Sequence, residues 1–447
     1  MRTLEYGRFA RFSLPFMGRA TRGASGVGFL PVAPQSPAPV ADATRPPHTP
    51  TDGGIRSTRA PGARAAGPHL MSLGVGIIAL GVWLYLLIAR GGFWLARERD
   101  DRDIPAASPA VWPSVVAVVP ARNEADVVAR SVGSLLTQDY SGDFRVVLVD
   151  DNSDDGTGDI ARALGGGERL TVITGAPLAD GWTGKLWAQS QGIAAAGGAD
   201  YVWLTDADIA HAQDSLIALV ARADAGNLVL TSLMAKLTVE TRAERLLIPA
   251  FVYFFAMLYP FAWVNDPRRG TAAAAGGCML VKRDALERAG GVAAIRGAII
   301  DDCTLGALMK RQGPVWLGLT ERAQSLRPYA GFDEIARMVS RSAYAQLGYS
   351  PVLLAGTVLG MSLIYLSPPV LTLVAPGLAR WIGLTAWMLM ALTFQPMLRL
   401  YRRSPLWGPA LPLIGALYTV FTVQSALDVW AGRGGLWKGR AQAMRAA

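Results

Sequence analysis

Three pairs of aspartates constrain the fold of this chain most strongly, because each pair lies where a short apolar run with β-strand character ends. The pairs are Asp150 and Asp151, Asp206 and Asp208, and Asp301 and Asp302. Carboxylates are costly beside an apolar core unless a cation or a hydrogen-bond donor meets them. We therefore expect the ends of these strands to form a site for such a ligand, which favours an enzyme.

Residues 113–349 form the predicted central domain, in which strand-like and helical runs alternate. Strands are predicted at 115–120, 144–151, 170–174, 201–208 and 228–232, and helices at 125–138, 157–164, 185–196 and 212–224. This alternation predicts an α/β fold with a mostly parallel sheet that has helices on both faces. Ligands bind at the carboxyl ends of the strands in such sheets, where Asp150 and Asp206 fall.

Residues 1–69 have a different composition. They hold nine arginines, three acidic residues and ten of the 28 prolines, so most of the net charge of +9 lies in this segment. We expect a disordered leader, and the basic balance therefore gives no reason to expect a nucleic-acid partner. The segment lacks the order of a signal peptide. Because Met71 opens the next apolar run, the native start at Met1 or at Met71 stays open.

Apolar segments flank the central domain. Residues 70–89 carry no charge and would extend roughly 30 Å as a helix, which is the thickness of a bilayer core. We predict a transmembrane helix at 70–90 and a linker at 91–112, whose arginines place the central domain in the cytoplasm. Three more apolar segments, near 350–374, 378–398 and 409–430, predict transmembrane helices within 350–430.

The basic tail, residues 431–447, conflicts with three complete C-terminal spans. Its arginines and lysine favour the cytoplasm, whereas three spans after a cytoplasmic domain would end outside. Either one segment is re-entrant or interfacial, or the tail departs from the positive-inside rule.

A further apolar run at 246–264 is long enough to span a bilayer. A span there would separate Asp206 from Asp302 across the membrane, so we expect an interfacial or groove-lining helix, kinked by Pro249 and Pro260.

Metal chemistry based on cysteine or histidine is not expected. Cys278 and Cys303 have no partners at metal-ligand spacing, and the three histidines are scattered along the chain. Both cysteines are predicted to serve as small reduced hydrophobic residues.

The segments Pro120-Ala-Arg-Asn-Glu124 and Asp150 to Thr157 closely resemble the opening signature of family 2 glycosyltransferases, which have a GT-A fold. The resemblance covers about residues 115–345. It implies that a nucleotide-sugar donor is bound by Pro120, Arg122, Asn123, Glu124, Asp150, Asp151, Lys185, Asp206 and Arg341. The backbone N–H groups of residues 121–124 would hold base or ribose oxygens, and Asp151 would bond the nucleoside. Asp154 to Thr157 are predicted to form a turn and a helix cap.

Two further motifs match this family. Lys185 begins a helix and would face the diphosphate as a point charge, the alternative being a solvated helix lysine. Asp206 and Asp208 match the metal motif and would hold Mg²⁺ or Mn²⁺, which neutralises charge on the departing diphosphate; the alternative is a cap for the next helix.

The acceptor side is predicted from residues 276–302. Gly276, Gly277 and Cys278 resemble the segment that lines the acceptor site. Asp302 matches the general base and Asp301 replaces a glutamate; adjacent like charges raise one pKa, which suits a base.

The segment 337–344 departs from the Gln-x-x-Arg-Trp motif of processive relatives, because Met338 and Ser342 stand at the Gln and Trp positions. This change favours single transfer over polymerisation. Arg341 would either contact the diphosphate or, with Arg337, face lipid phosphates.

The segments 182–185, 258–266 and 297–306, with the N-terminal apolar helix, most closely resemble the hopanoid-biosynthesis-associated branch. That likeness implies an enzyme of the bacterial inner membrane with a hopanoid-like lipid acceptor. The hypothesis is inverting, non-processive sugar transfer to a membrane lipid. The alternatives are a polysaccharide synthase and a non-catalytic membrane scaffold that retains the fold. The sequence does not identify the donor sugar, the acceptor or the oligomeric state.

Overall fold

The structure is a computed structural model that describes residues 66–102, 109–433, 436–437 and 440–441. The predicted leader at 1–69 lies almost wholly outside these residues. The chain divides into two units, Met1–Leu70 and Met71–Ala447, and the elements described below belong to the second unit apart from the first residues of α1.

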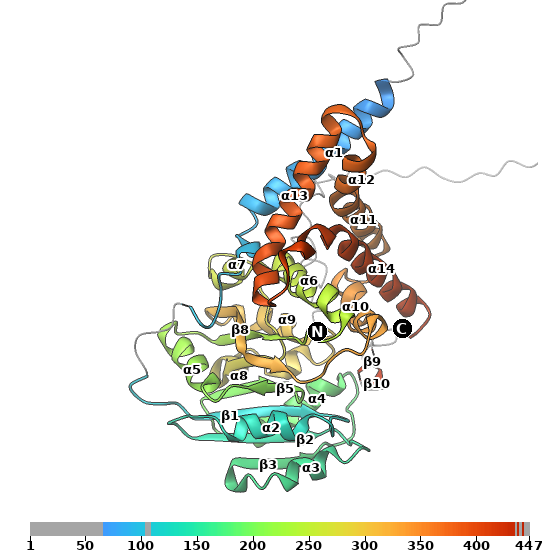
Figure 1. Ribbon diagram of the computed structural model, residues 1–447. Coiled ribbons are helices and arrows are strands. Elements are labelled where there is room, and N and C mark those ends of the chain that lie inside the picture. Colours follow the sequence, from blue (N-terminus) through green and yellow to red (C-terminus); the bar gives the residue numbers. More distant parts are fainter. Residues whose placement is uncertain (1–65, 103–108, 434–435, 438–439, 442–447) are drawn as a thin grey trace, which may run out of the picture. The chain divides into compact units, whose positions relative to one another are not determined.

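A mixed sheet of eight strands forms the centre of this unit (Figure 1), with the strand order β3-β2-β1-β4-β7-β6-β8-β5. The strands are β1 (Val115–Ala121), β2 (Phe144–Asp150), β3 (Leu170–Thr174), β4 (Tyr201–Thr205), β5 (Ile209–His211), β6 (Leu230–Lys236), β7 (Cys278–Lys282) and β8 (Val315–Ser325). Strands β1 to β4 are parallel to one another, and β6 is parallel to β8. Strand β7 pairs antiparallel with β4 and β6, and β5 pairs antiparallel with β8. The predicted strands are confirmed, except that the run 201–208 turns after Thr205 and continues as β5.

Helices cover both faces of the sheet, as predicted. They are α2 (Val128–Leu136), α3 (Thr157–Ala163), α4 (Gly184–Ala195), α5 (Ser215–Ala225), α8 (Arg283–Arg288) and α9 (Asp301–Lys310). Helix α10 (Phe332–Gln346) packs instead against helices, α6 and α14, whose bounds are given below. Val115, Ala117 and Val119 of β1 pack in one apolar cluster with residues of α2 and α5, and Val116 and Val118 pack in another with residues of α4. Because side chains alternate along a strand, the continuous apolar run of β1 is buried on both sides.

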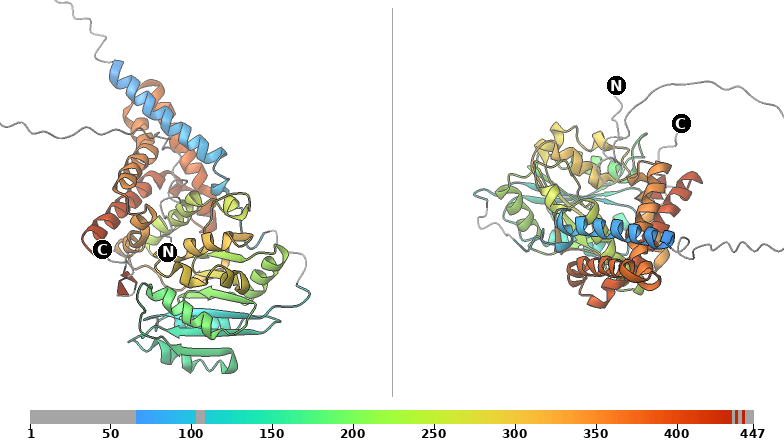
Figure 2. Two further views of the ribbon diagram at one scale, coloured as in Figure 1. Left: turned by 180° about the vertical axis from the view of Figure 1, so that it is seen from behind. Right: turned by 90° about the horizontal axis from the view of Figure 1, so that it is seen from above.

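The apolar segments at the two ends of the central domain are helical. They are α1 (Ala66–Ile88), α11 (Pro351–Met361), the π-helical turn η6 (Ser362–Leu366), α12 (Ser367–Val374), α13 (Gly377–Leu400), the 3₁₀ helix η7 (Pro405–Ala410) and α14 (Leu411–Trp430). By length and composition, four stretches of the described chain could cross a membrane: His69–Ile88, Pro351–Val374, Gly377–Leu400 and Pro405–Trp430. These helices lie together at the end of the unit opposite β3 and α3 (Figures 1 and 2).

The apolar run 246–264 forms two helices, α6 (Arg242–Leu258) and α7 (Phe261–Asn265). A capping box of Thr241 and Glu244 begins α6, and Pro249 lies inside it. Pro260 separates the two helices, which corrects the prediction of one kinked helix, because proline cannot donate a helical hydrogen bond.

Helix α6 is mostly buried, which corrects the prediction of an interfacial helix. The hydroxyls of Tyr253 and Thr393 lie 2.9 Å apart, and the Tyr418 hydroxyl donates to the Leu247 carbonyl at 3.0 Å. These bonds join α6 to α13 and to α14. Helix α6 therefore links the sheet domain to the apolar helices.

The segment from η7 to α14 begins and ends beside the sheet domain. Just before η7, the Arg402 guanidinium lies 3.6 Å from the Glu321 carboxylate on β8. Near the end of α14, the Ser425 hydroxyl accepts from the Tyr344 N–H of α10 at 3.0 Å, and the rings of Trp430 and Tyr344 lie 5.8 Å apart. The segment thus returns to the side from which it starts.

Candidate active site

Lys185 joins two of the predicted acidic groups. Its Nζ atom lies 2.8 Å from Asp206 Oδ1 and 3.2 Å from Asp301 Oδ2, and only 14% of its side chain is exposed. Burial lowers the pKa of Lys185, but the charges of Asp206 and Asp301 outweigh burial, so the pKa is raised. The alternative of a solvated helix lysine is therefore wrong.

The position of Lys185 follows from how α4 packs on β1. A Cβ atom at Gly192 would lie only 2.4 Å from Val118 Cγ1, so the glycine allows the helix to approach the strand closely. The first residues of α4 then lie beside the end of β4, where Asp206 follows Thr205. Asp301 comes from the first turn of α9.

Asp302 is held by two backbone N–H groups. Its Oδ2 accepts from the Gly276 N–H at 3.1 Å and its Oδ1 from the Cys303 N–H at 2.7 Å. Burial and then the charge of Asp301 raise the pKa of Asp302 to about 6, against the lowering effect of Lys185. A carboxyl group with this pKa is ionised at neutral pH and accepts a proton more readily than an ordinary aspartate.

Gly276 packs closely against both Lys185 and Asp302. A Cβ atom at this position would lie 3.2 Å from Lys185 Nζ and 3.5 Å from Asp302 Cβ. A Cβ atom at Gly277 would instead meet Ala235 at 3.2 Å, in the core. Of these two predicted acceptor-side glycines, the structure places Gly276 beside the acids and Gly277 against the core.

Cys278 lies away from the acids, which corrects its prediction as an acceptor-side residue. Its side chain is buried in the core, and its Sγ atom accepts from Trp203 Nε1 at 3.4 Å. Burial raises the pKa of this thiol to about 12. The cysteine therefore serves as a small hydrophobic residue, the role predicted from its isolation in the sequence.

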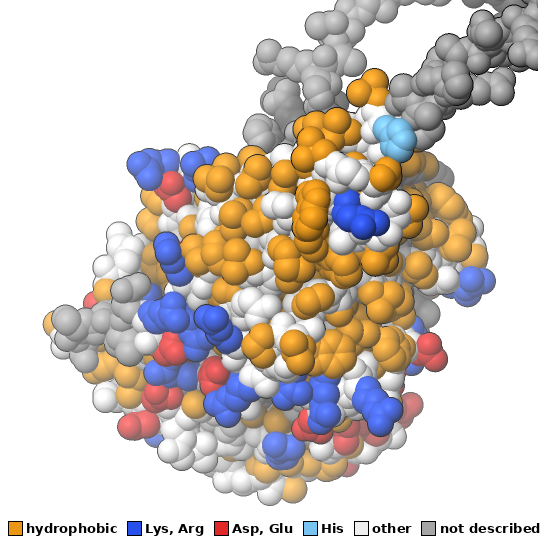
Figure 3. Space-filling view, turned by 45° about the horizontal axis from the view of Figure 1, so that its top comes forward, with side chains coloured by type: hydrophobic (Ala, Val, Ile, Leu, Met, Phe, Trp, Pro, Cys, Tyr) orange, Lys and Arg blue, Asp and Glu red, His pale blue; other side chains and the backbone are white. Residues whose placement is uncertain are grey.

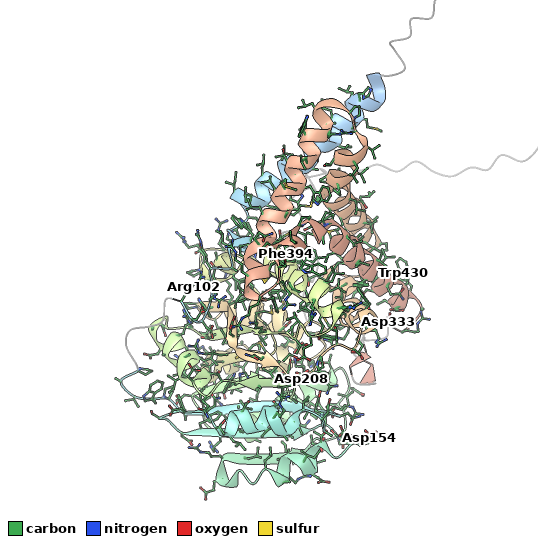
Figure 4. The ribbon with its side chains drawn as sticks, in the orientation of Figure 1. Arg102, Asp154, Asp208, Asp333, Phe394 and Trp430 are labelled. Atoms are coloured by element: carbon green, nitrogen blue, oxygen red, sulfur yellow. The ribbon has the colours of Figure 1, made fainter. Side chains whose placement is uncertain are left out.

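Asp208 lies near a second cation, Arg327, which the sequence reasoning did not identify. Burial, and then the charges of Asp206 and Glu124, raise the pKa of Asp208 to about 6, and the charge of Arg327 lowers it. The Arg327 guanidinium forms an ion pair with Glu124 and lies 3.0 Å from Asp126 Oδ1. Figure 4 shows Asp208 beside the sheet, below α9 and α10.

Only the topology could have identified Arg327. It follows β8, whose antiparallel pairing with β5 brings the residues after β8 beside the residues before β5, and the Leu326 N–H donates to the Asp208 carbonyl at 2.7 Å. The alternative of Asp206 and Asp208 as a helix cap is wrong, because α5 begins after Asp214.

Asp206 and Asp208 suit a divalent cation in part. Among the residues that the structure describes, no group of three or more His, Cys, Asp or Glu side chains could hold a metal ion. Both residues offer the hard oxygen atoms that Mg²⁺ and Mn²⁺ prefer, and Asp206 already holds a cation, the Lys185 ammonium. The pair fits a cation that takes its other ligands from phosphate and water.

The loops after β1 and β2 bind each other through groups that were predicted to bind the donor. The Asn123 N–H donates to Ser153 Oγ at 3.0 Å, and the Glu124 N–H donates to Thr157 Oγ1 at 2.8 Å. Two of the four N–H groups predicted to hold base or ribose oxygens, those of Asn123 and Glu124, thus have partners within the protein. Serine and threonine hydroxyls readily accept from backbone groups and so brace the loop. Asp155, in the predicted turn, accepts from the Thr157 N–H at 3.0 Å.

The other predicted donor-binding residues lie around these loops. Asp150 Oδ1 accepts from the Ser153 N–H at 3.0 Å, and Asp151 is fully buried. The Arg122 guanidinium donates to the carbonyl oxygens of Asp151 and Asn152. Pro120 lies buried in β1, beside Val149 of β2. Arg341 is exposed on α10, and its charge acts on Tyr329.

Comparison with known proteins agrees with the sequence motifs. Residues 116–290 match the family model described as Glycosyl transferase family 2. The chain therefore contains a glycosyltransferase domain of this family, and the matched range includes Lys185, Asp206 and Asp208 but ends before Asp302. Among curated proteins, no sequence matches the chain.

Solved glycosyltransferases resemble the structure at low sequence identity. A mannosyltransferase from Pyrobaculum calidifontis, in complex with GDP-Man and Mn²⁺, is 19% identical, with 80% of this chain and 99% of that chain covered and a TM-score of 0.49. Mannosyl-3-phosphoglycerate synthase from Rubrobacter xylanophilus is 18% identical, with coverages of 52% and 73% and a TM-score of 0.36. Glucosyl-3-phosphoglycerate synthase from Mycobacterium tuberculosis, in complex with phosphoglyceric acid, is 21% identical, with coverages of 53% and 80% and a TM-score of 0.34.

Proposed function

We propose that the family 2 glycosyltransferase domain of this chain transfers a single sugar, with inversion, from a nucleotide-diphosphate sugar to a membrane lipid. One observation carries the proposal: Lys185 contacts both Asp206, from the predicted donor side, and Asp301, from the predicted acceptor side. The residues predicted for the two substrates thus form one cluster, although the family match includes only the first of these acids.

The reaction follows from the chemistry of these side chains. Asp302 takes the proton of an acceptor hydroxyl, and the hydroxyl oxygen forms a bond to the anomeric carbon. The bond from that carbon to the diphosphate oxygen breaks on the opposite face, and its electron pair leaves with the diphosphate. The Gly276 and Cys303 N–H groups keep the Asp302 carboxylate in place. Mg²⁺ or Mn²⁺ held by Asp206 and Asp208 would neutralise charge on the leaving group.

A membrane acceptor is supported by the apolar helices gathered at one end of the unit. Figure 3 shows hydrophobic side chains over a continuous area of one face, with lysine and arginine side chains along its lower border. This pattern is typical of a surface that meets lipid tails and headgroups. We place the protein in a bacterial inner membrane with its catalytic domain in the cytoplasm. A hopanoid-like acceptor rests on the sequence resemblance of 182–185, 258–266 and 297–306.

Single transfer rests on the altered motif of α10. Met338 and Ser342 replace the glutamine and tryptophan of processive relatives, and Arg341 is exposed. These replacements weigh against a polysaccharide synthase, which would form products with many sugar units.

The test is the substitution Asp302→Asn in the purified full chain. An amide cannot accept the hydroxyl proton, so we expect transfer from a radiolabelled nucleotide sugar to a lipid extract to fall by at least ~100-fold, with unchanged nucleotide binding by calorimetry. The matched control is Asp284→Asn, which alters an exposed ion pair with Arg288 on α8. Weakened nucleotide binding with normal turnover would overturn the assignment of Asp302. A wild-type chain that transfers no sugar would favour the non-catalytic scaffold.

A further inference from the structure

We infer that the Lys185 ammonium takes the place of the divalent cation at Asp206. It pairs with the Asp206 carboxylate while the donor site is empty, and it moves away from this carboxylate when the cation and a nucleoside diphosphate bind. The inference rests on the proposed function, because it assigns the cation to Asp206 and Asp208. The sequence motif predicts only that Lys185 contacts the diphosphate. The inference adds that Lys185 pairs with Asp206 when no donor is bound.

The first support is the geometry of the ion pairs. Lys185 Nζ is closer to Asp206 Oδ1, at 2.8 Å, than to Asp301 Oδ2, at 3.2 Å. The Lys185 and Asp301 side chains are only 14% and 19% exposed. A carboxylate in such surroundings is costly without a cation nearby. Lys185 supplies that cation in the donor-free protein.

The second support is competition for one oxygen atom. Divalent Mg²⁺ binds carboxylate oxygen at roughly 2.1 Å, so a cation on Asp206 Oδ1 would lie a few ångströms from the ammonium. Two cations at that separation repel each other strongly in a partly buried site. Lys185 and the metal therefore cannot hold this oxygen in the same geometry, and one must move when the other binds.

The third support is the mobility of the ammonium at the end of its long side chain. Gly276 presents no side chain toward Lys185, and a Cβ atom there would lie 3.2 Å from Nζ. Lysine is flexible and has three donors, so the ammonium is able to shift while it keeps Asp301 as a partner. The diphosphate of a bound donor offers it new acceptors.

The small number of metal ligands adds a consequence. Asp206 and Asp208 alone give a divalent cation two side chains, and the described part of the chain holds no cluster of three. A cation that binds without nucleotide must displace Lys185 and gains only the two carboxylates as protein ligands. A cation that binds with a nucleoside diphosphate also gains phosphate oxygens as ligands, and the displaced ammonium gains the diphosphate as a new partner. Cation and nucleotide should therefore bind with positive coupling.

The experiment measures Mn²⁺ binding without turnover. Free Mn²⁺ is titrated by electron paramagnetic resonance against the purified full chain, with and without UDP or GDP. Without nucleotide, we expect Lys185→Met to bind Mn²⁺ about tenfold more tightly than the wild type, because the competing charge is gone. With nucleotide, this advantage should shrink, since the variant also lacks a phosphate partner.

The control is Lys236→Met, which removes another partly buried ion-paired lysine, 3.0 Å from Glu321. It should leave Mn²⁺ binding unchanged. Equal or weaker Mn²⁺ binding by Lys185→Met without nucleotide would overturn the inference. Because no sugar is transferred in this experiment, failure here is distinct from failure of the proposed activity.

A second variant serves if Lys185→Met does not fold. Lys185→Arg keeps the positive charge and offers a guanidinium that pairs well with carboxylates. It should weaken nucleotide-free Mn²⁺ binding severalfold; unchanged binding would contradict the inference. Folding of Lys185→Met only in the presence of Mn²⁺ would support it, because the metal would then replace the missing charge.

Discussion

At the scale of single residues, the site depends on which way each side chain of one short segment points. Gly276 borders Lys185 and Asp302, whereas Gly277 borders Ala235 and Ile209 in the core. The sequence presents them as two equivalent glycines. In the structure Gly276 contacts residues of the site and Gly277 contacts the core, so substitution of each by alanine should have a different effect.

We predict that Gly276→Ala lowers transfer severalfold with little loss of stability, because the new methyl group displaces only the mobile end of Lys185. Gly277→Ala should instead lower the free energy of unfolding by about 1–2 kcal/mol, since its methyl group would overpack the core. Initial transfer rates and thermal unfolding of both variants test this prediction. Equal effects of the two substitutions on transfer would show that Gly276 has no special place in the site.

The acids of the site could be predicted from the sequence because each follows a strand, and strand ends meet at one edge of an α/β sheet. The cation Arg327 could not, because no local pattern marks it and only the pairing of β8 with β5 brings it near Asp208. The bonds from Asn123 and Glu124 to Ser153 and Thr157 were also unpredictable. They depend on side-chain rotamers in two loops about thirty residues apart.

At the scale of elements, α9 is fixed at both ends. Its first turn carries Asp301 and Asp302, and its last residue, Lys310, holds the segment that leads to Gly276. Lys310 Nζ donates to the carbonyl oxygens of Trp263, Val264 and Thr271 at 3.1, 2.7 and 2.6 Å. This ammonium therefore joins the end of α7 to the helix that carries the proposed base.

We predict that Lys310→Met lowers the free energy of unfolding by about 2–3 kcal/mol, because three carbonyl groups lose a charged donor. Transfer should also fall, since the segment before β7 positions Gly276. Chemical denaturation monitored by tryptophan fluorescence measures the first effect. Arg288→Met, in an exposed pair on α8, is the control and should change stability by less than ~0.5 kcal/mol. A similar loss in both variants would contradict the assigned role of Lys310.

The elements themselves were well predicted where hydrophobic periodicity was strong, as in β1 to β4 and α2 to α5. The run 246–264 was not, because its apolar character is the same for an interfacial helix and for a buried one. Burial of α6 depends on partners such as Thr393 and Tyr418, which come from α13 and α14 far along the chain. Composition alone cannot identify such partners.

At the scale of the whole molecule, the return of the η7–α14 segment bears on the conflict over the basic tail. The segment starts beside Glu321 of β8 and ends beside Tyr344 of α10, both in the sheet domain. We propose that this segment is re-entrant, because both of its ends lie beside the same domain. A re-entrant segment would place the basic tail on the side of the catalytic domain, as the positive-inside rule requires.

We predict that a cysteine introduced at the exposed position Pro376 reacts with an impermeant maleimide from outside the cell, and that one at Gly432 reacts only after the membrane is opened. The native Cys278 and Cys303 are buried, so background labelling should be low. Pro376 lies between α12 and α13, and Gly432 follows α14. Labelling of both positions from outside would mean that the last segment spans the bilayer.

The bonds between α10 and α14 also couple the sheet domain to the last apolar helix. Ser425 accepts from the Tyr344 N–H and donates to the Ser340 carbonyl, so that the two helices are joined at two points. A shift of the re-entrant segment within the surrounding lipid would therefore carry α10 with it. Lipid composition would then act on the domain through the contact between these two helices, without any contact between lipid and the acids of the site.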